Sequence, residues 1–384
     1  MPWKETCAVN EREKFIQQCE GNENFAELCR QYGISRKTGY QWVRRYEALG
    51  PAGLLDRQPI AQHHPQAREA EVVDEVVRLR KEHPHWGPKK LLGYLLGKHP
   101  EGDWPAASTI GDWLNKYGLI RPRRRRLRSP GGSGALVERG PEPNAEWCAD
   151  FKGSFVLGDG KRCYPLTVTD EYSRYLLLCE GLLITKDKLV QEQFARVFCE
   201  YGLPQRIRTD NGVPFASVGP GGLTALSVWW LKLGIQLDRI ELAQPQQNGV
   251  HERMHRTLKA EALNPPAADL VTQQRVFDLF RREYNQVRPH EALEQTPPAV
   301  HYAVSRRSYP RGLESPSYQD MKVRWVSPGG VISWRGHAVN VGACLGGEPV
   351  GLRQISESSW EVMYGPVRLG RLDDRDKEGT LHRD

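Results

Sequence analysis

The stretch RIRTDNGVPF, at residues 206–215, places an acidic side chain at the point where a short predicted strand ends. Ile207 lies within that strand, and Asn211 and Gly212 have the turn-forming chemistry that stops it. Asp210 is therefore predicted at the C-terminal edge of a sheet, which is where open α/β sheets place their functional sites. The stretch thus predicts an α/β fold with a site at one sheet edge.

Two further carboxylates, one on each side of this stretch, lie in comparable contexts. Asp150, in EWCADFKG at 146–153, falls inside a predicted strand over 147–157, where an acid is unfavourable without a partner or a role. Glu252, in QQNGVHERMHRTLKAE at 246–261, lies near the start of a predicted helix over about 248–262. Each alone has a simpler explanation, as a turn former, an edge residue or a complement to the helix dipole. Together, in this order, they favour one shared site.

The segments around the carboxylates predict a mixed α/β sheet flanked by helices. Besides the first strand and the last helix, we expect strands over 163–169, 175–181, 205–209 and 235–240, and helices over 187–201 and 222–234. Asp170 is a possible fourth acidic ligand, but its place at a hairpin corner favours a structural role in the turn.

Three carboxylates on separate elements form a set of oxygen donors that suits hard divalent cations, most naturally two Mg²⁺ ions, with Mn²⁺ as a substitute. Two such ions, roughly 3.5–4 Å apart, activate an attacking oxygen and stabilise the leaving oxygen of a phosphodiester. The sequence therefore predicts Asp150, Asp210 and Glu252 as catalytic metal ligands in an enzyme that cuts or joins nucleic acid.

The region at 144–303 resembles the catalytic core of bacterial insertion-sequence transposases, the Asp-Asp-Glu recombinases that share the retroviral-integrase fold. The resemblance is carried by four motifs in the same order: ADFKG around Asp150, RTDNGVPF around Asp210, PQQNGVHERMHRTLKAE around Glu252, and REYNQVRPHEAL at 282–293. It implies an RNase-H-like core, with the three carboxylates as metal ligands. Lys259, on the helix of Glu252, resembles the basic residue that integrases place on terminal DNA near the site; a solvated lysine on the helix face is the alternative. Arg256 of the same helix is also expected to contact DNA.

One departure from the family concerns the third carboxylate. Glu252 follows Asp210 by 252 − 210 = 42 positions, a few more than the usual integrase spacing, and the glycines at 219–222 are consistent with an added turn. Glu241 is a competitor for the third position, but its flanking residues do not match the motif.

Two helical units are predicted before the core. In residues 1–55, a helix, a glycine turn at Gly33 and a second helix capped by Ser35 form a helix-turn-helix signature. The residues expected to face DNA from the second helix are Arg36, Lys37, Tyr40 and Arg44. Residues 66–120 resemble a second helix-turn-helix or winged domain, in which Lys89 and Lys90 are expected to bind DNA; a plain helical bundle is the alternative.

A basic segment at 121–143 is predicted to link these units to the core. It contains an acid-free run of arginines followed by Ser-Pro-Gly-Gly, which favours a flexible chain lying along phosphates, although a merely solvated tail is the alternative. The residues expected to contact DNA here are Arg123, Arg124, Arg125 and Arg126. The formal net charge of +7 agrees with a polyanionic partner.

After Pro310, short apolar runs separated by Gly, Pro and Ser turns predict a small all-β domain at 320–374. It resembles the SH3-like barrel that follows the core in integrases and related transposases. Since such a barrel carries no chemistry, contact with DNA or protein is the expected use.

The full prediction is a multidomain transposase that binds the terminal inverted repeats of its element and catalyses metal-dependent cleavage and strand transfer. The expected partners are double-stranded DNA and further copies of this chain. The eight cysteines contain no Cys-x-x-Cys pair, and we find no signal sequence or long apolar stretch. We therefore expect a cytoplasmic, nucleoid-associated protein without membrane contact. An RNase-H-like nuclease and a domesticated DNA-binding regulator are the alternative functions.

Overall fold

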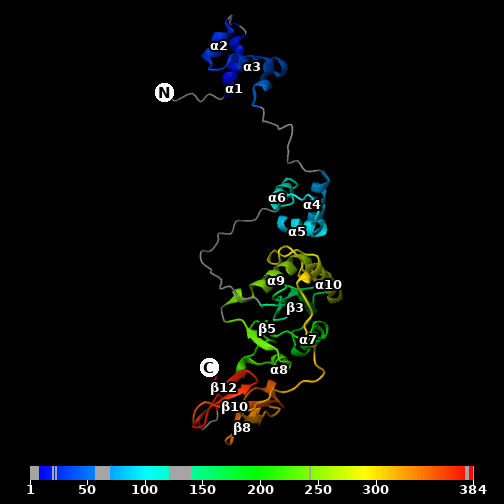
Figure 1. The fold of residues 1–384 in the computed structure, drawn as a ribbon, viewed down its shortest axis with the longest axis vertical. Helices are drawn as coiled ribbons and strands as arrows, with labels where there is room; N and C mark the ends of the chain where they lie inside the picture. Colours follow the sequence, from blue (N-terminus) through cyan, green and yellow to red (C-terminus); the bar gives the residue numbers. More distant parts are fainter. Residues whose placement is uncertain are drawn as a thin grey trace. The chain divides into compact units, whose positions relative to one another are not determined.

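The computed structural model describes residues 8–19, 21, 24–56, 70–120, 140–241, 244–376 and 380–383. The chain divides into two compact units, residues 1–68 and 69–384, whose elements are shown in Figure 1. The predicted linker contacts at Arg123, Arg124, Arg125 and Arg126 lie outside the described residues.

In its described residues the first unit contains three α-helices, α1 Ala8–Cys19, α2 Phe25–Gln31 and α3 Arg36–Leu49. They pack around a small core that includes Phe15, Leu28 and Cys29. Gly33 has a φ of 66°, as the turn between α2 and α3 requires. The Ser35 side chain caps α3 by accepting a hydrogen bond of 3.1 Å from the backbone N–H of Thr38. The predicted helix-turn-helix is confirmed.

The second unit begins with α4 Ala70–Glu82, α5 Pro88–Lys98 and α6 Ala107–Lys116. Their apolar faces enclose a core of Val76, Leu79, Trp86, Leu91, Leu95, Ile110 and Leu114, against which Val287 also packs. Through Val287, these helices therefore contact the segment that directly follows α10 Leu270–Gln286.

A mixed sheet forms the centre of the second unit. Its strands are β1 Glu146–Phe151, β2 Phe155–Val156, β3 Arg162–Asp170, β4 Leu176–Leu182, β5 Arg206–Thr209 and β6 Gln236–Arg239. The order is β2-β3-β1-β5-β6, with β4 also paired to β3. The β1–β3 and β3–β4 pairs are antiparallel, whereas β1–β5 and β5–β6 are parallel. The prediction of a mixed sheet is confirmed.

One strand boundary was predicted wrongly. The continuous strand expected over 147–157 is broken into β1 and β2, because Gly153 adopts a φ of 70° and its N–H bonds back to the carbonyl of Phe151. β1 therefore ends one residue after Asp150.

Four helices flank the sheet: α7 Asp187–Tyr201, α8 Ala225–Lys232, α9 Gly249–Ala262 and α10 Leu270–Gln286 (Figure 1). Trp147 and Ala149 of β1 pack in one core with α7 and α8. A second core joins α9 and α10 to the other face through residues such as Cys179, Met254 and Phe277. Because side chains alternate along a strand, Asp150 is directed to the face covered by α9.

The C-terminal region is all-β, as predicted. It contains β7 Lys322–Trp325, β8 Val331–Trp334, β9 His337–Asn340, β10 Pro349–Gln354, β11 Ser359–Tyr364 and β12 Val367–Asp373. Four of these strands form a sheet in the order β12-β11-β10-β7, and β8 pairs with β9. Among the described residues the β8–β9 hairpin bonds to neither edge of the larger sheet, so the strands do not close into the expected SH3-like barrel. The two sheets instead share an apolar core that includes Trp334 and Trp360.

Candidate active site

The site is built on two adjacent parallel strands. β1 pairs with β5 in parallel, and Ala149 lies opposite Thr209. Asp150 and Asp210 each follow directly, so the register places them as neighbours at the carboxyl ends of the two strands. Asp210 also begins the turn that the sequence predicted, since its carboxylate accepts a hydrogen bond of 3.1 Å from the N–H of Gly212.

The pKa of Asp150 is shifted by burial and by the charged groups around its carboxylate. Burial is the main cause that raises the pKa of Asp150 to about 7, and the negative charges of Asp210 and Glu252 raise it further. The backbone amide of Phe151 and the charge of Lys152 act in the opposite direction. Asp150 therefore lies within electrostatic reach of the other two predicted carboxylates. Like charges gathered in a partly buried place are stabilised by a bound cation.

Glu252 projects from the polar face of α9. Residues His251, Met254, His255, Leu258 and Ala262 make the buried face of this helix. Glu252, Arg256 and Lys259 are all exposed, and their spacing of four and then three residues places them on one stripe. The helix thus presents one carboxylate and two of the predicted DNA-binding side chains on the same side.

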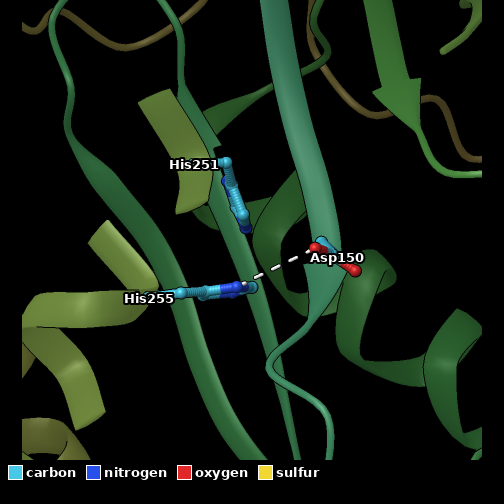
Figure 2. A group of neighbouring side chains, drawn as sticks. All are labelled: Asp150, His251 and His255. Atoms are coloured by element: carbon cyan, nitrogen blue, oxygen red, sulfur yellow. Dashed lines mark ion pairs between the residues drawn. The ribbon is translucent and has the colours of Figure 1, made fainter. Parts of the chain in front are cut away.

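Two histidines that the sequence analysis did not select lie beside Asp150. The ligand atoms of Asp150, His251 and His255 lie within 4.8 Å of one another, and His255 Nδ1 is 3.8 Å from Asp150 Oδ2 (Figure 2). Their spacing of four residues on one helix, among apolar neighbours, was the signal available in the sequence. The sequence did not show against which strand His251 and His255 would pack.

These histidines are poorly placed as a pair of metal ligands. His251 Nε2 is 2.8 Å from Thr167 Oγ1, and its Nδ1 is 2.8 Å from Thr169 Oγ1, so both ring nitrogens are already hydrogen-bonded. The carboxylates fit a hard divalent ion better, because such ions prefer oxygen ligands.

The predicted DNA-binding residues differ in their surroundings. Arg36, Lys37, Tyr40 and Arg44 are exposed on α3. Lys89 forms an exposed ion pair of 2.8 Å with Glu291. Lys90 donates to the backbone carbonyl of Pro289, and burial lowers the pKa of its ammonium group to about 8. Both lysines of α5 thus have partners in the segment that follows α10.

Several known families match successive parts of the chain. A helix-turn-helix domain matches residues 11–60 and a homeodomain-like domain residues 38–114. Two integrase core domain families match residues 140–245 and 233–298. The C-terminal domain of IS481 family transposases matches residues 321–380. The matches therefore cover both helical units, the mixed sheet and the C-terminal strands.

Two relatives come from bacterial insertion elements. The uncharacterized 39.2 kDa protein of insertion element IS476 from Xanthomonas euvesicatoria is 31% identical over 230 residues, which are 58% of this chain and 62% of that protein. The match thus spans less than two thirds of that relative. The uncharacterized 31.7 kDa protein of insertion element IS407 from Burkholderia multivorans is 30% identical over 242 residues, 60% of this chain and 80% of that protein.

Among solved structures, the HTLV-2 integrase catalytic core domain in complex with magnesium aligns over 43% of this chain and all of that chain, with 16% identity and a TM-score of 0.34. A chain of the simian T-cell lymphotropic virus intasome aligns over 76% of this chain and 97% of its own length, with 15% identity and a TM-score of 0.38. On the evidence of the insertion-element relatives and the domain families, the chain belongs to the bacterial insertion-sequence transposases with an integrase core, and it carries the C-terminal domain of the IS481 family.

Proposed function

We propose that this chain binds the terminal inverted repeats of its own insertion sequence and catalyses metal-dependent cleavage and strand transfer at those ends. The observation that carries the proposal is the parallel register of β1 and β5, which makes Asp150 and Asp210 neighbours, together with the influence of Glu252 on the pKa of Asp150. Three carboxylates, from two strand ends and one helix, would supply the oxygen donors that this chemistry uses.

In this proposal Asp150, Asp210 and Glu252 hold two Mg²⁺ ions, for which Mn²⁺ can substitute. Ions bound there activate an attacking oxygen and stabilise the leaving oxygen of a phosphodiester. Water would cut the element end to leave a 3′-OH, and that hydroxyl would then attack a phosphodiester of the target in line, forming a new P–O bond while the 3′-oxygen of the cut target strand leaves. Asp150 in β1 and Asp210 directly after β5 are neighbours by register, and Glu252 lies in the first turn of α9.

DNA is engaged at two kinds of surface. Arg36, Lys37, Tyr40 and Arg44 are proposed to contact bases from α3, because the recognition helix of a helix-turn-helix lies in the major groove. Arg256 and Lys259 are proposed to hold phosphates beside Glu252, and Lys89, Lys90 and the arginines at 123–126 to hold phosphates further away. Because both ends of an element must be joined together, we propose that the active form is a homo-oligomer.

None of the described helices is both long and apolar enough to cross a bilayer.

The test is an in vitro reaction with duplex oligonucleotides that carry the repeats flanking the coding region. The purified full chain with Mn²⁺ or Mg²⁺ should cut at the repeat end and join that end to a target duplex, whereas Glu252→Gln should bind the repeat and do neither. Cleavage without joining, on any duplex, would indicate an RNase-H-like nuclease instead. Specific binding without any cleavage by the wild-type chain would indicate a DNA-binding regulator.

A further inference from the structure

Four buried side chains connect the helix of Glu252 to the sheet. They are Thr167 and Thr169 of β3 and His251 and His255 of α9. Thr167 Oγ1 lies 2.8 Å from the Nε2 atoms of both histidines, and Thr169 Oγ1 lies 2.8 Å from His251 Nδ1. Figure 2 shows His255 pointing from its helix toward Asp150. The cluster therefore lies between the helix that carries Glu252 and the strand next to β1.

The bonding capacity of Thr167 fixes the direction of each hydrogen bond. Thr167 Oγ1 is 3.0 Å from the backbone carbonyl oxygen of Asp150, and a carbonyl can only accept. The single hydroxyl proton of Thr167 is therefore donated to Asp150. The two lone pairs that remain must accept from Nε2–H of His251 and from Nε2–H of His255. Both rings consequently carry a proton on Nε2.

The other ring nitrogens follow from this assignment. Both rings are buried, and a neutral imidazole carries a proton on only one of its two nitrogens. Nδ1 of each ring is then unprotonated. His251 Nδ1 accepts from the Thr169 hydroxyl, and His255 Nδ1 directs a lone pair toward Asp150. Thr167 has all of its donor and acceptor positions occupied, so the geometry around it is closely specified.

The network reaches two of the proposed metal ligands. Its first contact is the backbone carbonyl of Asp150 itself. Its histidines are adjacent to Glu252 and three residues beyond it on the same helix. We propose that Thr167, His251 and His255 are positioning residues, which hold α9 on β3 so that Glu252 and Asp150 share a divalent ion. This inference rests on the proposed function, since it concerns the same metal site.

The experiment compares two substitutions of the central threonine in the full chain. Thr167→Val keeps the branched shape and removes the hydroxyl, whereas Thr167→Ser keeps the hydroxyl and removes a methyl group. Binding of Mn²⁺ alone is measured by calorimetric titration. Since the loss of groups that orient metal ligands weakens metal binding by about 10- to 100-fold, we expect that loss in Thr167→Val and near wild-type binding in Thr167→Ser.

A second readout follows the ring protons directly. Nitrogen NMR of selectively ¹⁵N-histidine-labelled protein should show both rings as Nε2–H tautomers in the wild type and in Thr167→Ser, and should show altered signals in Thr167→Val. Should Thr167→Val fail to fold, Thr169→Val removes only the bond to His251 Nδ1, and a smaller loss of Mn²⁺ affinity is expected from it.

Different results would contradict the positioning role and the proposed metal site. Wild-type Mn²⁺ affinity in a folded Thr167→Val protein would overturn the positioning role while leaving the metal site in place. If Thr167→Val does not fold, wild-type Mn²⁺ affinity in a folded Thr169→Val protein would likewise overturn the positioning role. If the wild type binds Mn²⁺ no better than Asp150→Asn does, the metal site fails, and the inference fails with it.

Discussion

Asp150 and Asp170 are two aspartates on neighbouring strands of one sheet, and their surroundings differ sharply. Asp170 is completely buried, and its carboxylate accepts hydrogen bonds of 2.7 Å from the N–H of Asn144, 2.7 Å from the N–H of Ser173 and 2.6 Å from the Ser173 hydroxyl. Asp150 instead faces the negative charges of Asp210 and Glu252 and the unprotonated nitrogen of His255. Burial raises the pKa of both carboxylates, but hydrogen bonds from Ser173 and Asn144 oppose this at Asp170, whereas the charges of Asp210 and Glu252 add to it at Asp150.

The largest expected effect tests this contrast through activity. Asp150→Asn, Asp210→Asn and Glu252→Gln should each lower the rate of end cleavage by on the order of 10³-fold or more, because each removes a charge that holds ions worth several kcal/mol to the transition state. Asp170→Asn should leave the rate per folded molecule within about tenfold of wild type, since the group touches no reacting atom. The assay is cleavage of a labelled repeat duplex at low temperature. Equal losses in Asp150→Asn and Asp170→Asn would break the comparison.

The second effect concerns stability and pH in the absence of metal. The pKa of Asp150 is raised from its ordinary value of 3.8 to about 7 in the folded chain. Below pH 4 both folded and unfolded chains are protonated at this position, so the contribution to stability is fully present. It is lost as the pH rises to 7, because the unfolded chain releases the proton first. The difference is at most about 4 kcal/mol over three pH units.

Urea denaturation of the wild type and of Asp150→Asn in EDTA, at several pH values between 4 and 8, measures this contribution of Asp150 to stability. Asp150→Asn should lose less stability as the pH rises and should be the more stable protein at pH 8. Added Mn²⁺ should stabilise only the wild type. If the stability of the two proteins changed with pH in the same way, the pKa of Asp150 in the folded chain would not be near 7.

The third effect is the opposite result at Asp170. Asp170→Asn should destabilise the chain by about 2–3 kcal/mol, because an amide nitrogen in place of one carboxylate oxygen leaves buried donors of Asn144 or Ser173 unpaired. Ser173→Ala should lower the free energy of unfolding by about 1 kcal/mol, because it removes the hydroxyl that donates to Asp170 and accepts from the N–H of Tyr175. Urea denaturation at pH 8 measures both. A neutral Asp170→Asn would mean that this carboxylate is not the structural member of the pair.

Sequence reasoning found the features that depend on local chemistry. The strand end and turn at Asp210, the start of the Glu252 helix and the turn role of Asp170 all follow from neighbouring residues, whereas the end of β1 one residue after Asp150 was missed. It did not find features that depend on which elements meet. Lys90 was selected as a DNA contact, and only the fold shows that it is half-buried and donates to the backbone carbonyl of Pro289. The pairing of His251 and His255 with Thr167 required knowing that α9 packs on β3. Closure of the C-terminal barrel likewise depends on strand pairings that short apolar runs do not encode.

The smallest expected effect concerns Glu241, the competitor for the third ligand. Glu241 is exposed and follows β6, and its backbone N–H is bonded to the side chain of Gln247 at 2.9 Å. The charges that shift the pKa of Asp150 include Glu252, which enters α9 in its first turn. An exposed substitution away from such a site changes energies by about 0.5 kcal/mol or less, so Glu241→Gln should keep cleavage within about threefold of wild type.

Glu252→Gln is the matched change, since it removes one carboxylate of the same length from the neighbouring helix. Measured side by side with Mn²⁺ and the same repeat duplex, Glu241→Gln should cleave and join, while Glu252→Gln should only bind. The reverse result would move the third ligand from α9 to the segment after β6. The network of Thr167, His251 and His255 would then position a helix that holds no metal. Of the three proposed ligands, Asp150 and Asp210 would be retained, and Glu241 would replace Glu252.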